Sequence, residues 1–229
     1  MAIARYLAMT ANEFATVQTI PEKMAWMACH FSPYSTTLSN LPDDLPANSL
    51  LILNDSTPPD HQDPAAVAEI LLDTLQKLDC VGLLLDFQRP DCPKSETIVQ
   101  ELLKLDFPVC VSACYAKNYD CSVFLPPLPL TVPFAEYIAP WKSRKIWLDT
   151  ALSCERITVT ENGTTFQELT SPPECSLVDK ELHCHYHTEN TEDSLVFTLR
   201  RTKDDLNDLL AEAESFGIMG AVGLYQELK

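Results

Sequence analysis

An acid and an amide stand two residues apart at the end of a strongly apolar segment. Asp86 and Gln88 follow the glycine and three leucines of residues 82–85. Alternate side chains of a β-strand share a face, so these two are expected to point the same way, about 7 Å apart. A carboxylate can act as an acid or a base, whereas an amide donates and accepts hydrogen bonds without transferring a proton. The pair predicts either a site for a polar ligand or a polar pair that satisfies itself.

Other polar side chains are expected near the same place. Arg89 precedes a proline at the mouth of the strand, where it could bind an anionic or hydroxylated ligand, or pair with Asp86 or Asp91. Tyr115 and Tyr225 close two further apolar segments. The carboxyl ends of parallel strands are where α/β folds place their ligand sites. Asp86, Gln88, Arg89, Tyr115 and Tyr225 are therefore the predicted ligand-binding residues, and no residue is predicted to be catalytic.

His30 and Asp55 also end, or nearly end, predicted strands. Each is either a residue of the same mouth or an ordinary polar residue at a strand end, since the tops of barrels are polar in any case.

The elements that must position these residues alternate between strand and helix. Helix starts are predicted at Thr10, which opens a Thr-x-x-Glu capping box, and at Asp63-Pro64. Further helices are predicted over 95–105, 134–140 and 203–216. The predicted inner strands cover residues 3–9, 24–31, 49–55, 82–88, 109–115, 122–125, 145–152 and 220–225.

Eight such strands with intervening helices predict an α/β fold with a parallel sheet. We expect a (β/α)8 TIM-type barrel, trimmed or partly irregular because several connections are too short for a full helix. A doubly wound open sheet is the alternative. It is disfavoured because no glycine-rich phosphate-binding turn follows any strand, and the chain has only 5 glycines.

The alternation stops at residues 155–200, which predict an antiparallel β insertion. Asn162-Gly163 is a strong hairpin signal between two short strand-forming segments, and two more strands are predicted over 182–188 and 194–200. We interpret residues 1–229 as a single domain that carries this insertion before its last helix and strand.

The segment Gly82-Leu83-Leu84-Leu85-Asp86-Phe87-Gln88 resembles the signature of the family 18 glycoside hydrolases, the chitinase-like barrels. That signature reads Asp-Gly-x-Asp-x-Asp-x-Glu on the fourth strand. Asp86 matches its third aspartate and Gln88 stands at its catalytic glutamate, while Val81 and Leu84 replace the first two aspartates.

The closing segment, residues 221–225, resembles the last strand of that family, with Tyr225 in place of the tryptophan that floors the sugar site. Two other family motifs are missing: the third strand lacks Ser-x-Gly-Gly and the sixth lacks Met-x-Tyr-Asp. Residues 155–200 lie outside the resemblance.

The resemblance implies a saccharide ligand and a missing acid catalyst. In the resembled family the glutamic acid protonates the leaving oxygen, and the neighbouring aspartate steadies the acetamide that acts as nucleophile. Loss of a general acid lowers rates by about 10²–10⁴-fold. With Gln88 in that position, the pocket is expected to bind without hydrolysing by the family mechanism.

His183, His185 and His187 alternate along one predicted strand. Imidazoles on one face could hold zinc with a water as fourth ligand. A solvated edge strand is the interpretation we favour, so neither a metal nor a cofactor is expected.

The amino-acid composition argues against some classes of binding partner. With 16 basic and 33 acidic residues, the net charge of −17 disfavours nucleic acid and anionic membrane surfaces. No apolar run approaches the roughly 20 residues of a membrane span, and the start does not resemble a signal peptide. The nine cysteines form no Cys-x-x-Cys pair, which favours reduced thiols and a cytoplasmic location.

Taken together, the sequence predicts a chitinase-like barrel of the pseudoenzyme type that binds a small saccharide or other polar ligand at its mouth. Two alternatives remain at this point: a hydrolase with altered chemistry that uses Asp86, and a scaffold that offers the β insertion to a protein partner. The oligomeric state is left open.

Overall fold

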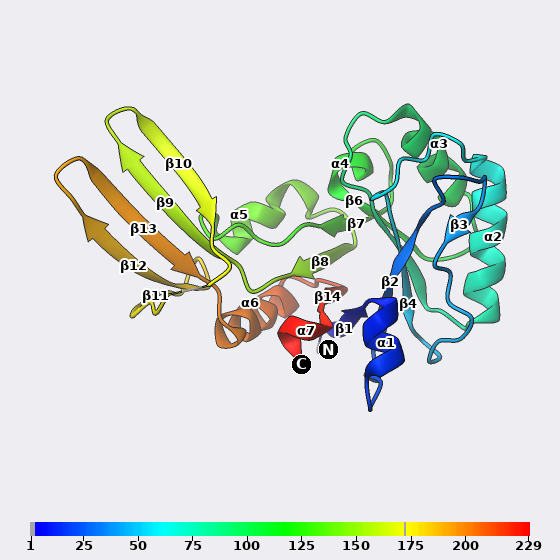
Figure 1. The fold of residues 1–229 in the computed structure, drawn as a ribbon, viewed down its shortest axis with the longest axis horizontal. Coiled ribbons are helices and arrows are strands. Elements are labelled where there is room, and N and C mark those ends of the chain that lie inside the picture. The colour runs from blue at the N-terminus through cyan, green and yellow to red at the C-terminus, as the bar shows by residue number, and fades with distance from the viewer. Residues whose placement is uncertain (1–2, 172) are drawn as a thin grey trace.

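The computed structural model describes residues 3–171 and 173–229, and it has two parts (Figure 1). A barrel of parallel strands surrounded by helices forms one part, and an antiparallel sheet that projects away from it forms the other. The first and last elements of the described chain, β1 and α7, both lie on the barrel side. Within the described residues, no helix has the length and apolar character required to cross a membrane.

The barrel is closed. In the described chain, eight parallel strands neighbour one another in the order β1-β14-β8-β7-β6-β5-β4-β2, and β1 also pairs with β2. Their bounds are β1 Ala4–Met9, β2 Met24–Phe31, β4 Leu50–Asn54, β5 Gly82–Asp86, β6 Val109–Ser112, β7 Ser122–Leu125, β8 Ile146–Thr150 and β14 Gly220–Leu224. The predicted α/β barrel is confirmed, with complete closure by the β1–β2 pairing.

The layer of helices is uneven, as the short connections indicated. The helices are α1 Ala11–Thr16, α2 Pro64–Lys77, α3 Pro93–Leu102, α4 Ala113–Ala116, α5 Phe134–Ile138, α6 Lys203–Ser215 and α7 Tyr225–Leu228, with a 3₁₀ turn at Ala139–Trp141. A short strand, β3 Leu38–Ser39, takes the place of a helix between β2 and β4. Thr10 and Asp63 cap α1 and α2 as predicted.

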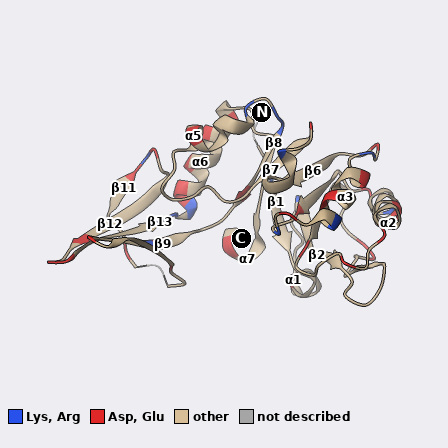
Figure 2. Ribbon diagram, turned by 90° about the horizontal axis from the view of Figure 1, so that it is seen from above, with Lys and Arg blue, Asp and Glu red and all other residues tan. Residues whose placement is uncertain are grey.

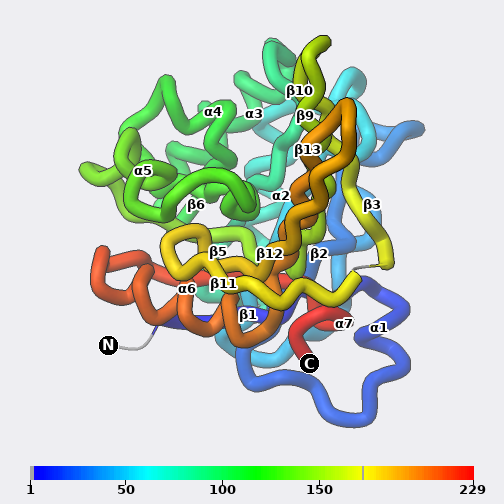
Figure 3. Tube along the Cα trace, turned by 90° about the vertical axis from the view of Figure 1, so that its left-hand side faces the viewer, coloured from blue at the N-terminus to red at the C-terminus, as the bar shows by residue number. Residues whose placement is uncertain are grey.

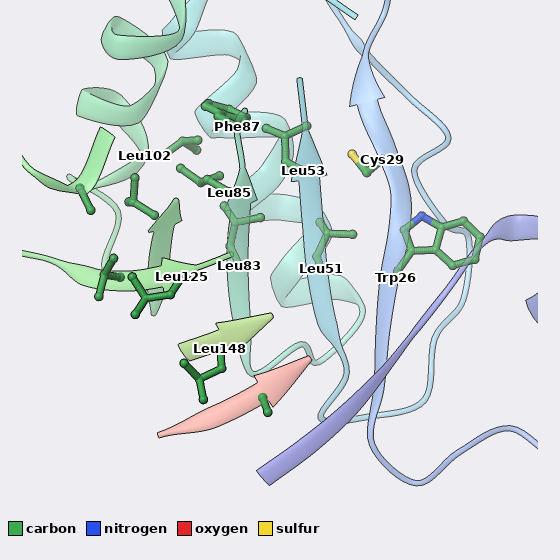
Figure 4. Packing of buried hydrophobic residues seen from close by; sticks show 14 of the residues in the cluster. Trp26, Cys29, Leu51, Leu53, Leu83, Leu85, Phe87, Leu102, Leu125 and Leu148 are labelled. Carbon is green, nitrogen blue, oxygen red and sulfur yellow. The ribbon is translucent and has the colours of Figure 1, made fainter. Parts of the chain in front are cut away.

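The alternating residues of each strand separate two cores. Leu84 faces the lumen, where it packs with side chains from the other strands, including Tyr6, Ile52 and Phe124. Leu83, Leu85 and Phe87 face outward, into the larger core between the strands and the helices (Figure 4). The predicted division of residues 83–88 between two faces is therefore confirmed.

The insertion is a five-stranded antiparallel sheet in the order β10-β9-β13-β12-β11. The strands are β9 Cys154–Thr160, β10 Gly163–Glu168, β11 Leu177–Asp179, β12 Cys184–Asn190 and β13 Ser194–Arg200. The predicted hairpin turn lies between β9 and β10, and Gly163 has φ +133°, which favours glycine. Figure 3 looks toward this sheet and shows it in front of the barrel.

Several strand ends differ from the prediction: β5 ends at Asp86 and β8 at Thr150, each two residues early. Two further differences change where a predicted site residue lies. The strand predicted over 109–115 ends at Ser112, and Ala113–Ala116 turns into the short helix α4. The strand predicted over 220–225 ends at Leu224, and Tyr225 begins α7. Both tyrosines are therefore helical, which changes where their side chains lie.

Candidate functional site

Asp86 and Gln88 form a hydrogen-bonded pair at the carboxyl end of β5, the fourth barrel strand in chain order. The amide Nε2 of Gln88 donates to Oδ1 of Asp86 at 3.1 Å and approaches Oδ2 at 3.4 Å. Both side chains also line cavities at the mouth of the barrel. The sequence left open a self-satisfied polar pair and a ligand site. The structure is compatible with both, because the two side chains bond to one another and still face a cavity.

Asp55 fixes the chain just beyond this pair. Its carboxylate is 3% exposed and accepts the backbone N–H of Gln88 at 2.9 Å and that of Arg89 at 3.0 Å. Two backbone donors on one buried carboxylate hold the end of β5 in a single conformation. Asp55 also lines the mouth, and it orients Gln88 through the backbone.

Asp149 is the residue of the mouth that sequence reasoning missed. It lies on β8, three strands around the barrel from β5, and it lines both cavities that contain Asp86. A signal was present in the sequence. Ile146 and Leu148 face the outer core and Trp147 packs in the lumen, so alternation gives Asp149 the inward face.

The negative charge of Asp86 disfavours a second charge on Asp149. Burial raises the pKa of Asp149 to about 7, and the negative charge of Asp86 adds to the shift. Burial also raises the pKa of Asp86; the hydrogen bond from Gln88 lowers it, and the charge of Asp55 raises it again. The mouth therefore holds one carboxyl that changes its protonation state near neutral pH.

Asn54 is a second residue that the sequence did not single out. It pairs in register with Asp86, and its side-chain amide donates to the carbonyls of Met27 and Cys29 at 3.1 and 3.0 Å. The register of β2 against β4 shifts between Trp26 and Cys29, which frees these carbonyls from regular pairing. Asn54 thus supplies hydrogen-bond donors to the irregular part of β2, and it also lines the mouth.

Two adjoining cavities form the mouth, with volumes of about 330 and 340 Å³. They share Asp86, Gln88, Phe124 and Asp149, so these residues lie where the cavities meet. No lysine, arginine or histidine lines either cavity within the described residues. A mouth with acids, amides and apolar walls suits a neutral or cationic polar ligand rather than an anion.

Arg89 and Tyr115, both predicted at the mouth, line neither cavity. Arg89 Nη2 donates to the carbonyl of Ser56 at 2.8 Å and pairs with neither Asp86 nor Asp91. Tyr115 is 5% exposed in the outer core, where its ring meets Phe87 edge-on and its hydroxyl donates to the Arg89 carbonyl. The turn of α4 carries Tyr115 outward, so it supports the loop after β5 from behind.

Tyr225 and His30, also considered for the mouth, lie outside it as well. As the first residue of α7, Tyr225 packs against the outer core, and the ammonium of Lys229 lies 5.2 Å from its ring centre. His30 Nε2 lies 3.1 Å from the side-chain amide of Asn40, outside both cavities.

The three histidines of the insertion do not converge. His183 precedes β12 with φ +49°, and its Nε2 lies 2.6 Å from Glu212. His185 Nδ1 lies 2.8 Å from Asp205, and His187 is 3.9 Å from Glu189. His185 and His187 alternate along β12 as predicted, whereas His183 lies before the strand and, like His185, contacts an acid of α6. In the part of the chain that the structure describes, no group of three or more metal-ligating side chains is placed to hold an ion.

Comparison with known proteins finds no family model and no curated sequence that match, but it finds similar structures. The spore cortex-lytic enzyme SleL of Bacillus cereus superposes with a TM-score of 0.62 at 10% identity, over 100% of this chain and 72% of its own. The chitinase-like agglutinin of Robinia pseudoacacia gives 0.62 at 11% identity, over 98% and 95%. This is the fold of the family 18 barrels.

A third family 18 structure contains a saccharide. The chitinase of Cycas revoluta, a double mutant in which one glycine is tryptophan and one glutamate is glutamine, is in complex with (GlcNAc)4. It superposes with a TM-score of 0.56 at 9% identity, over 96% of this chain and 94% of its own. At these identities the likeness establishes the family 18 fold, as the segment 82–88 indicated, and leaves the activity to be argued from the site.

Proposed function

We propose that the mouth of the barrel binds a small neutral saccharide of the N-acetylated amino-sugar type and does not hydrolyse it by the family 18 mechanism. The observation that carries the proposal is the Gln88–Asp86 pair, which faces the two joined cavities at the end of the fourth barrel strand. Sugar hydroxyls and an acetamide need donors and acceptors together, and this pair offers both.

The same pair argues against acid catalysis at this position. The amide of Gln88 has no proton that it could transfer to a leaving oxygen near neutral pH. Its hydrogen bond to Asp86 also occupies part of the carboxylate that would steady a nucleophile. Binding is retained in such an arrangement, whereas the step that general acid catalysis accelerates is lost.

Titration calorimetry with (GlcNAc)4 tests the binding. We expect the wild-type protein to bind, and Asp86→Ala to bind at least about tenfold more weakly because a hydrogen bond to a charged group is lost. Asp44→Ala, an exposed aspartate outside the mouth, is the matched control and should bind like the wild type. Absence of binding, or equal affinity in Asp86→Ala, would contradict the proposal.

A hydrolase with altered chemistry is the second candidate, and Asp149 is the observation that favours it. Its pKa of about 7 leaves a protonated carboxyl across the lumen from Asp86. One protonated and one ionised carboxyl can act as acid and base in hydrolysis. In that case the protein would turn over aryl N-acetylglucosaminides, and both Asp86→Ala and Asp149→Asn would abolish turnover.

The two candidates are separated by turnover of the wild type, and Gln88→Glu tests whether the rest of the site is intact. Under the binding proposal the wild type shows no turnover. The variant gains it only if the rest of the family machinery is intact, which the leucine at position 84 and the valine at position 81 disfavour. Turnover by the wild type itself would establish the second candidate and overturn the non-hydrolytic claim.

A further inference from the structure

One face of the antiparallel sheet is apolar and open at its outer end. In the β10, β9 and β13 ladders, Phe166 opposes Ile157 and Ile157 opposes Phe197, so the three share a face. Val159 and Leu195 form the next row of the same face, farther from the barrel. We call Val159, Phe166, Leu195 and Phe197 the outer apolar patch.

The patch is exposed because the residues that pack against this face of the sheet lie only at its end near the barrel. At its base Ile157, Cys184 and Leu199 are buried together with Leu130 from the loop after β7. Beyond that point, Phe166 is 67% exposed, and Val159 and Leu195 are 37% and 38% exposed. An apolar group of side chains that shares one face and has an acidic border is typical of an interaction site.

The border of the patch carries a pair of like charges, and one of the two, Glu155, also interacts electrostatically with the buried guanidinium of Arg201. Glu155 and Glu168 lie directly opposite one another on the same face, in the row next to Phe166 and Ile157. Opposed like charges destabilise a sheet. Among the described residues, no ion pair involves either glutamate. A cation supplied from outside would relieve this repulsion.

The sheet also has an open edge beside the patch. β10 is the edge strand, and all six of its residues, Gly163–Glu168, are exposed. It contains no proline, no lysine and no irregularity in its pairing with β9, and its single charged residue, Glu168, lies at its end, so few of the devices that protect edges are present. An extended segment can add to such an edge through backbone hydrogen bonds while its side chains contact the adjoining face.

We infer that the outer apolar patch and the β10 edge bind an extended segment of a partner protein that places an apolar and a basic side chain next to each other on one face. The apolar side chain packs on Phe166, and the basic one lies over Glu155 and Glu168. This role is independent of the ligand at the barrel mouth.

A second copy of the chain fits this surface poorly. Its β10 contains no lysine or arginine that could meet the two glutamates, and each chain carries a net charge of −17. Figure 2 shows Asp and Glu at the outer end of the sheet, which adds to the repulsion between copies. A partner with lysine or arginine meets the acidic border with the opposite charge.

The test uses a fluorescently labelled peptide that repeats the sequence Thr-Val-Thr-Lys. When extended, such a peptide presents valine and lysine on one face, as the patch requires. We expect fluorescence anisotropy to show binding that weakens at high salt. A peptide with glutamate in place of lysine should not bind.

Variants locate the contact. Phe166→Ser and Glu168→Lys should each weaken binding at least about tenfold, and Glu168→Lys should improve binding of the glutamate peptide. Thr165→Lys, on the opposite face of the same strand, is the matched control and should change affinity less than about twofold. Hydrogen exchange should slow in β10 when the lysine peptide is bound, and thermal unfolding verifies that each variant is folded.

Several outcomes would overturn the inference. Equal binding of both peptides, or equal loss in Thr165→Lys, would show that neither the charge nor the face matters. A dimer that Phe166→Ser abolishes in sedimentation would make a second copy the occupant. Displacement of the peptide by (GlcNAc)4 would make the patch a saccharide surface. Asp86→Ala should leave peptide binding unchanged, so failure at the mouth and failure at the sheet are distinguishable.

Discussion

The carboxyl of Asp149 changes its protonation state near neutral pH, because burial and the negative charge of Asp86 together raise its pKa to about 7. Asp86 meets a different environment, since the amide of Gln88 donates to it and offsets part of the burial. Environment thus gives two aspartates at one mouth different preferences for the proton. At the scale of the residue, this difference is what a ligand or a substrate would encounter.

Asp149→Asn should stabilise the protein at pH 8 by about 2 kcal/mol and have little effect at pH 4. The folded pKa of Asp149 is raised, so the folded state keeps a proton that the unfolded state releases above pH 3.8. The free energy of unfolding of the wild type therefore falls as the pH rises from 3.8 toward 7. Asparagine cannot ionise, so the variant does not show this fall. Urea unfolding at the two pH values measures it.

Asp44→Asn serves as the control, because this exposed aspartate lies outside the mouth. Equal unfolding free energies for wild type and Asp149→Asn at pH 8 would contradict the proposed burial of the charge.

At the scale of the element, β14 and β8 show how a glycine on one strand makes room for a tryptophan on the next. Gly220 lies in register with Trp147 of β8, and a Cβ at Gly220 would lie 2.5 Å from the Trp147 ring. The absence of a side chain there leaves space for the indole in the lumen. The barrel interior is thus filled by a large residue on one strand and a glycine on the next.

Gly220→Ala should destabilise the protein by about 1–3 kcal/mol, because the new methyl group overpacks the lumen against an aromatic ring. The neighbouring Met219→Ala, 48% exposed, should change the unfolding free energy by less than about 0.5 kcal/mol. Denaturant unfolding compares the two. The double variant Trp147→Leu/Gly220→Ala should recover part of the loss, and additive losses would refute the contact as the cause.

The sequence predicted most elements because their signals are local. Apolar runs marked the inner strands, capping residues marked α1 and α2, and alternation placed residues 83–88 on two faces. The ends of β6 and β14 were not predicted, because Tyr115 and Tyr225 continue apolar runs although the backbone has already turned. Asp149 was missed because an acid within an apolar strand becomes a mouth residue only when the barrel closes around it.

At the scale of the whole molecule, one buried arginine joins the sheet to the barrel. Arg201 is 2% exposed and follows β13 directly. Its guanidinium donates to the carbonyl of Leu128 in the loop after β7, and to those of Leu182 and His183 ahead of β12. Three carbonyls from two parts of the chain thereby receive donors from a single side chain.

Arg201→Leu should destabilise the protein by about 3 kcal/mol, since it leaves three carbonyls without their donor. Arg201→Lys keeps a charge but not the three-way geometry, so its loss should be nearly as large. Hydrogen exchange should quicken in β12 and in residues 126–130 while β5 stays protected. Uniform quickening across the barrel would mean that Arg201 supports the whole fold rather than the junction.

Native mass spectrometry of the protein with (GlcNAc)4 tests the central claim most directly, because one spectrum reports both the complex and the state of its ligand. The proposal predicts one intact tetrasaccharide on each wild-type chain and none on Asp86→Ala. Shorter saccharides released during incubation, or equal occupancy of wild type and Asp86→Ala, would contradict a mouth that binds through Asp86 without cleaving.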